Sequence, residues 1–182
     1  MRLSTLIRLW IWTALLALVA FAILAATDMK LKAATGFGTV DLQSVRNAAQ
    51  ADHIFTAWFN QAHSATAGFQ LGFDYLFMPL YAIAFYFSAM LAREAFFPKR
   101  GVWRRAIDYL GYVPLVGAIA DAVENALEYA MLAGGATDSL ASDAFVATSI
   151  KTTCFYVGLA LFVAGFAAVM KLRRPKKTEE DA

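Results

Sequence analysis

Long apolar runs separated by polar connections dominate the hydropathy pattern of this chain. The first run, Leu9 to Thr27, contains no charged residue, and the second and fourth are interrupted only by Asp74 and Lys151. A helix needs about 20 apolar residues to cross a bilayer. The pattern therefore predicts four transmembrane helices, over about residues 6–27, 68–93, 106–135 and 144–171.

The longest polar connection, residues 28–67, carries a second kind of pattern. Within DLQSVRNAAQADHIFTAWFNQA, apolar residues recur at helical spacing, and Asp41 is a suitable N-cap. A connection of this length is unusual without internal structure. We therefore expect an amphipathic helix here, lying on the outer surface or capping the bundle.

Composition supports a membrane protein. The chain has 182 residues, 60% hydrophobic and 16% charged, with a mean hydropathy of +0.54, whereas soluble domains are about half apolar and a quarter charged. The expected fold class is all-α, a four-helix transmembrane bundle over residues 1–172, followed by a disordered polar tail over 173–182. A cleaved signal peptide is the alternative for the first run, but "ILAAT" offers no clear cleavage site, which favours a retained helix.

Basic residues predict an orientation. Most Lys and Arg residues precede the first run, connect the second to the third, or follow the fourth. The positive-inside rule then places both termini in the cytoplasm, which we assign to a bacterial inner membrane. Trp10, Trp12 and Trp103 would mark the inner interface and Trp58 the outer one. The net charge of +2 suits the lipid bilayer as a partner and gives no indication of nucleic-acid binding.

The stretch DAVENALEYA is the main chemical feature. Asp121, Glu124, Asn125 and Glu128 stand at i, i+3, i+4 and i+7 and so share one helix face. Counting from the expected outer boundary at 1.5 Å per residue, Asp74, Glu128 and Lys151 lie at one depth, about 10 Å inside.

Charged side chains within a bilayer cost about 2.5–3.5 kcal/mol each, so this set should face the bundle interior or a wet cavity. Acids outnumber Lys151 by four to one, and we expect some to be protonated; Glu124 and Glu128 are the best candidates for a shared proton. Purely structural packing remains an alternative, and Glu128 has a further one, contact with outer headgroups.

Other residues complete the expected site. Pro79 and Pro114 would kink their helices and widen the outer half of the bundle, and Tyr81 and Tyr156 are the tyrosines expected to line a cavity. Ala160, Ala164, Ala168 and Gly165 form a small-residue stripe that suits helix packing, within the chain or in a homodimer.

Metal binding is not indicated. His53 and His63 stand ten residues apart, and Cys154 is the only cysteine, so neither gives a ligand spacing typical of metals. No motif points to a cofactor, and none specifies a catalytic residue.

The motifs FDYLFMPLY, DAVEN and TGFG carry a resemblance. Together they resemble a group of poorly characterised bacterial four-helix integral membrane proteins, with Asp-x-x-Phe…Pro-x-Tyr in one helix and Asp-x-x-Glu-Asn in the next. The matching positions here are Asp74, Phe77, Pro79, Tyr81, Asp121, Glu124 and Asn125. The resemblance implies the fold and no particular activity.

Three functions remain open from the sequence. The leading hypothesis is an acidic cavity near the outer face that binds or moves a cation, a proton or a polar lipid headgroup. Its ligand-binding residues would be Asp74, Asp121, Glu124, Asn125, Glu128, Lys151, Tyr81 and Tyr156. The alternatives are an intramembrane lipid-modifying enzyme and an accessory or assembly subunit of a larger membrane complex.

Overall fold

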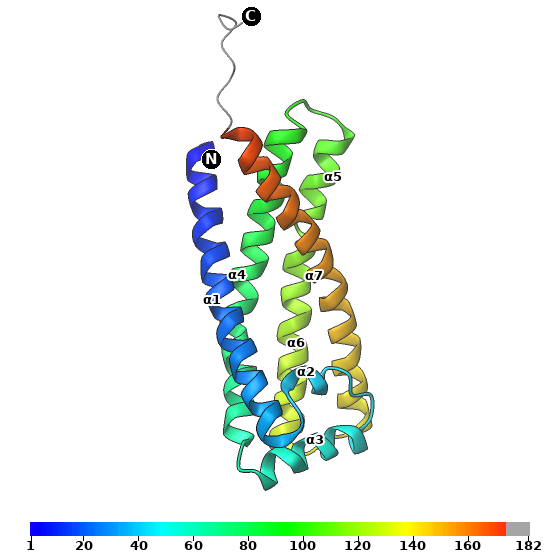
Figure 1. Ribbon diagram of the computed structural model, residues 1–182. Helices are drawn as coiled ribbons and strands as arrows, with labels where there is room; N and C mark the ends of the chain where they lie inside the picture. Colours follow the sequence, from blue (N-terminus) through cyan, green and yellow to red (C-terminus); the bar gives the residue numbers. More distant parts are fainter. Residues whose placement is uncertain (174–182) are drawn as a thin grey trace, which may run out of the picture.

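Seven α-helices make up the part of the chain that the computed structural model describes, residues 1–173 (Figure 1). They are α1 (Leu3–Thr35), α2 (Thr39–Leu42), α3 (Ala48–Asn60), α4 (Ser64–Phe96), α5 (Val102–Leu110), α6 (Val113–Gly134) and α7 (Asp138–Leu172). Four segments of this part are long and apolar enough to cross a membrane: α1, α4, α7, and α5 with α6 together. The predicted all-α, four-helix membrane bundle is confirmed.

The long helices extend beyond the apolar runs that predict them. The α1 helix continues through the polar turn after Asp28 and ends where Gly36 adopts a φ of 87°, a left-handed conformation that favours glycine. The α4 helix begins at Ser64, so the connection predicted over 28–67 is shortened to residues 36–63. Polar residues with good helix propensity, such as Lys30 and Lys32, extend a helix past its apolar part.

The third apolar run is not one helix. It breaks at Gly111 and Tyr112, so the membrane-spanning segment predicted over 106–135 is divided between α5 and α6. Pro114 lies in the first turn of α6, where a missing N–H leaves no hydrogen bond unmade. Pro114 therefore starts a helix instead of kinking one, whereas Pro79 lies inside α4 as predicted.

The α2 and α3 helices lie across one end of the bundle, which we name the capped end (Figure 1). The N-cap of α3 is Asn47, whose side chain accepts from Gln50 N at 3.0 Å; the prediction of Asp41 as this cap is wrong. The apolar face of α3 (Ala51, Ile54, Phe55 and Trp58) packs with Leu31, Met131 and Ala144 from the long helices. The predicted amphipathic helix therefore caps the bundle.

The tryptophans divide into two groups. Trp58 is fully buried and donates from Nε1 to Phe37 O at 2.8 Å, so its side chain packs inside the protein. Trp10 is also buried, and its Nε1 donates to Ser88 Oγ at 2.7 Å. Trp12 and Trp103 are exposed. A buried indole needs a partner for its N–H, and both buried tryptophans have one.

The α4 helix is the centre of the bundle, because α1, α6 and α7 all pack against it. Two glycines of α7 permit the close approach: a Cβ on Gly165 would lie 2.7 Å from Ser88 Cα, and one on Gly158 would overlap the Phe85 ring. Of the predicted small-residue stripe, Gly165 and Ala168 are buried within the chain and Ala160 is exposed. The tail predicted to be disordered lies outside the described residues, apart from Arg173, which ends α7.

The Gly165 contact yields a stability prediction. Gly165→Ala should lower the free energy of unfolding by about 1–3 kcal/mol, because the new methyl group meets backbone that cannot move aside. The control is Gly72→Ala on α4, where a Cβ meets nothing within 4 Å. Thermal unfolding in detergent should show a lower melting temperature for the first variant only; equal melting temperatures would contradict this packing.

Candidate functional site

The acidic stretch forms the inward face of α6. Asp121, Glu124, Asn125 and Glu128 are each no more than 5% exposed. They continue a buried stripe that begins with Pro114 and Gly117 and ends at Met131. The inward orientation expected from the spacing is confirmed, and the alternative that Glu128 reaches headgroups is wrong, because this side chain is only 1% exposed.

Lys151 joins α7 to this face through two ion pairs. Its Nζ donates to Asp121 Oδ1 at 2.9 Å and lies 2.8 Å from Glu124 Oε2, the latter without hydrogen-bonding geometry. The Lys151 side chain is 12% exposed and those of its partners 6% or less. Burying one of these charges alone would be costly, so the three side chains stabilise one another in this position.

Two hydrogen bonds between α4 and α6 complete the pairing. Tyr81 Oη donates to Asp121 Oδ2 at 3.1 Å. Asn125 Nδ2 donates to Asp74 Oδ2 at 2.9 Å and lies 3.3 Å from Leu71 O. Asp121 is therefore held by partners from both α4 and α7, and Asp74 by an amide of α6.

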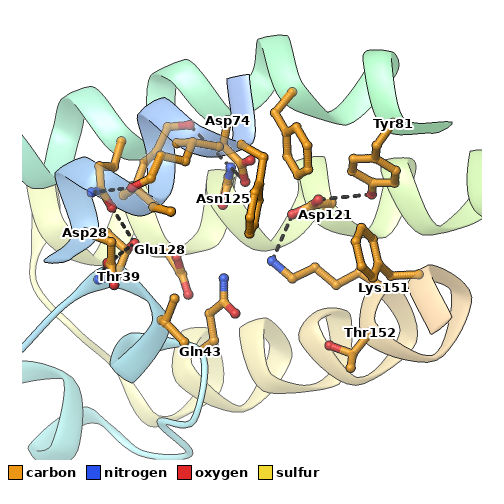
Figure 2. A pocket seen from close by; sticks show the side chains of 18 of the residues that line it. Asp28, Thr39, Gln43, Asp74, Tyr81, Asp121, Asn125, Glu128, Lys151 and Thr152 are labelled. Carbon is orange, nitrogen blue, oxygen red and sulfur yellow. Dashed lines mark hydrogen bonds and ion pairs between the residues drawn. The ribbon is translucent and has the colours of Figure 1, made fainter. Parts of the chain in front are cut away.

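Glu128 is the member of this cluster with neither a hydrogen bond nor an ion pair within the described part of the chain. The carboxyl oxygens of Glu124 also accept no hydrogen bond there, but Glu124 is paired with Lys151. Figure 2 shows the Glu128 carboxyl and the Gln43 amide pointing into the same space. A buried polar group without a partner costs free energy, and such a group in a folded protein calls for an explanation.

A cavity of about 440 Å³ lies at this place, between α1, α2, α4, α6 and α7. The volume falls within the range of small-molecule sites, about 300–1,000 Å³. Of the eight residues predicted to bind a ligand, the structure brings seven to the cavity wall: Asp74, Tyr81, Asp121, Asn125, Glu128, Lys151 and Tyr156. Glu124 lies behind the wall, paired with Lys151.

Several lining residues were missed by the sequence analysis: Asp28, Thr39, Gln43, Gln70 and Thr152. Asp28 Oδ1 accepts from Thr39 N at 2.6 Å and from Thr39 Oγ1 at 2.8 Å (Figure 2). The Gly38 backbone passes so near that a Cβ would lie 2.5 Å from this carboxylate. The TGFGTVD stretch contained that signal, since a glycine before a hydroxyl residue permits close backbone approach.

The α2 helix is held over the cavity by a second carboxylate. Asp41 accepts from Lys32 Nζ and from Gly38 N, both at 2.8 Å. Burial alone would raise the pKa of the Asp41 carboxyl, but these two donors outweigh it and lower the pKa. Asp28 and Asp41 thus fasten the segment that follows α1 from two sides.

The two histidines and the cysteine are not among the residues that line the cavity. His53 packs edge-on against Phe37, and Cys154 packs against Gly117 at the α6–α7 contact. Within residues 1–173, no three His, Cys, Asp or Glu side chains are grouped as they would be to hold a metal ion.

The fold and this cluster define a multi-pass membrane protein with a cavity between its helices, lined mainly by apolar surface together with several carboxyl groups. Chemically, the wall offers carboxylate acceptors beside apolar surface, with its one lysine already engaged. No protein-family model, curated protein or solved structure matches the chain.

The Lys151 ion pairs can be tested by stability. Lys151→Met should cost about 3–5 kcal/mol, because it leaves Asp121 and Glu124 buried without a cation. Adding Asp121→Asn and Glu124→Gln should recover most of that loss. Thermal unfolding in detergent is the measurement, with Lys30→Met at an exposed site of α1 as the control. Additive losses across the three substitutions would show that the groups are not coupled.

Proposed function

We propose that this protein binds a ligand with a positively charged, hydrogen-bond-donating group in the cavity of Asp74, Asp121 and Glu128. The observation that carries the proposal is the Glu128 carboxyl, which is buried, faces the cavity and has no hydrogen-bond partner in residues 1–173. An ammonium donor at this place would supply the missing partner and a charge-assisted hydrogen bond.

Charge supports the same proposal. Asp28, Asp74, Asp121 and Glu128 line the cavity, and among residues 1–173 Lys151 is the only cation that does so. Lys151 is already shared between Asp121 and Glu124. The remaining acidic groups favour a cationic ligand over an anionic one, because like charges in an enclosed site repel strongly.

The cavity's size distinguishes between kinds of cation. About 440 Å³ is far more than one inorganic ion occupies, and the wall combines aromatic and aliphatic side chains with the carboxyls. Mixed walls of this kind are typical of organic ligands. The proposed ligand is therefore an organic ammonium compound, held by Glu128 with Asp74 and Asn125 close by.

Glu128→Gln tests this function. The substitution keeps the shape of the side chain and removes its charge, so it should weaken ammonium binding at least tenfold, the equivalent of about 1.4 kcal/mol. It should not lower thermal stability, since it removes an uncompensated buried group. The assay is retention of radiolabelled butylammonium and dodecylammonium by the protein in phosphatidylcholine nanodiscs.

The matched control is Asp143→Asn, an exposed acid of α7 outside the cavity wall. It should bind both compounds as the unchanged protein does. The proposal would be overturned if the unchanged protein binds neither compound, or if the Glu128→Gln variant binds them as tightly as the unchanged protein does.

We further propose that the capped end faces away from the cytoplasm of a bacterial cell, with both termini inside. Support comes from the basic residues, which gather where α4 connects to α5 and around the opposite end of the bundle from α2 and α3 (Figure 1). Fusions after Leu172 should give fluorescent green fluorescent protein and inactive alkaline phosphatase. Alkaline phosphatase inserted at Gln61, between α3 and α4, should be active; the reverse result would invert this topology.

A further inference from the structure

The cavity lies where α1 and α7 border it without packing closely together. The extensive packing of α1 is with α4. At the end opposite the cap, Trp10 of α1 meets Phe162 of α7 with ring centroids 5.5 Å apart. Toward the capped end the two helices diverge (Figure 1), and both line the cavity. The cavity therefore occupies the side of the bundle where α1 leaves α7.

The rim on that side is apolar. Phe21 on α1 is 52% exposed and Tyr156 on α7 is 66% exposed, and both belong to the cavity wall. Both stand within helices long and apolar enough to cross a membrane. Side chains exposed on the flank of such a helix contact lipid, so the rim opens toward acyl chains.

The cap covers part of the cavity's end near it. Asp28 and Asp41 fasten the segment that carries α2, and α3 buries Ile54, Phe55 and Trp58 over the ends of the long helices. Met29 and Val40 of the wall are 72% and 61% exposed at this end. On the flank, α1 and α7 are not among the closely packed pairs of helices, so few contacts between them need to break.

The interior is divided between apolar and acidic surface. Phe77 and Phe155 form an aromatic wall, with Phe77 next to Phe21 (centroids 6.0 Å apart) and Phe155 next to Tyr81 (5.4 Å). The acidic groups follow α6 from Asp121 to Glu128, a span of about 10 Å at 1.5 Å per residue. A ligand that satisfies both surfaces needs a cationic end and an apolar body.

We infer that the ligand is a membrane amphiphile with an ammonium headgroup, which reaches the cavity sideways from the bilayer between α1 and α7. The ammonium group binds at Glu128, and the chain lies along Phe77 and Phe155 and leaves past Phe21 and Tyr156. This inference rests on the proposed function and adds the ligand class and the route. A group of acidic residues would not be sufficient evidence for a ligand. The second observation is the Glu128 carboxyl, which is buried, faces the cavity and has no hydrogen-bond partner within residues 1–173.

A bulky substitution on the proposed path of the ligand's alkyl chain tests the binding of that alkyl chain separately from the binding of the ammonium group. Ala25 lines the cavity from α1, and Ala22, one turn earlier, is exposed outside the wall. Ala25→Trp should weaken the Glu128-dependent binding of dodecylammonium at least tenfold. Butylammonium, which has no long chain to place, should bind within twofold of the unchanged protein. Ala22→Trp should leave both unchanged.

The assay uses the same nanodiscs, and retention by the Glu128→Gln variant is subtracted so that partitioning into lipid cancels. Retained butylammonium binding also shows that the Ala25→Trp variant is folded. If Ala25→Trp leaves the Glu128-dependent binding of both compounds intact, or weakens both equally, the inference of a membrane amphiphile is overturned. The proposed binding of an ammonium ligand then still stands. Absence of Glu128-dependent binding for both compounds would overturn the proposed function itself, and this inference with it.

Discussion

The burial of carboxyl groups among apolar helices is the constraint on which this structure depends. Each ionised group taken out of water needs a partner, and Lys151 supplies one to Asp121 and Glu124 together. That requirement sets the rotation of α6 and α7 about their axes, because no other face of α6 could present both acids to one amine. Tyr81 and Asn125 extend the pairing to α4, so the polar contacts orient three of the long helices.

The cavity exists because the long helices pack closely against α4 but not all against one another. The α4 helix packs against α1, α6 and α7, with Gly158 and Gly165 allowing the close approach of α7. The α1 helix depends on α4 for most of its packing and is drawn toward α7 only near Trp10 and Phe162. Space therefore remains beside Glu128, the acid of the α6 cluster that has no hydrogen bond or ion pair within residues 1–173. The proposal of a binding site rests on this carboxyl and the space beside it.

Much of the architecture could be predicted from particular residues. Four apolar runs predicted the spanning helices, and the i, i+3, i+4, i+7 spacing of Asp121, Glu124, Asn125 and Glu128 predicted a shared inward face. Helix ends were less predictable: α1 continues past its apolar run, and Pro114 starts a helix that it was expected to bend. Helix ends are set by helix propensity and capping, which act over single turns. A hydropathy pattern averages over many turns and therefore does not locate them.

The sequence by itself determined the class of protein, the helical fold and the face on which the acids lie, because those depend on composition and on the period of one helix. Tertiary structure alone decided which acids are paired with Lys151, that Trp58 of the cap is buried, and that Asp28 and Thr39 line the cavity. These outcomes depend on how far each helix lies from its neighbours along the bundle. Contacts between residues distant in the chain, such as Lys151 with Asp121, leave no periodic trace in either segment. Only the packed helices could therefore reveal that Glu128 has no hydrogen-bond partner within residues 1–173.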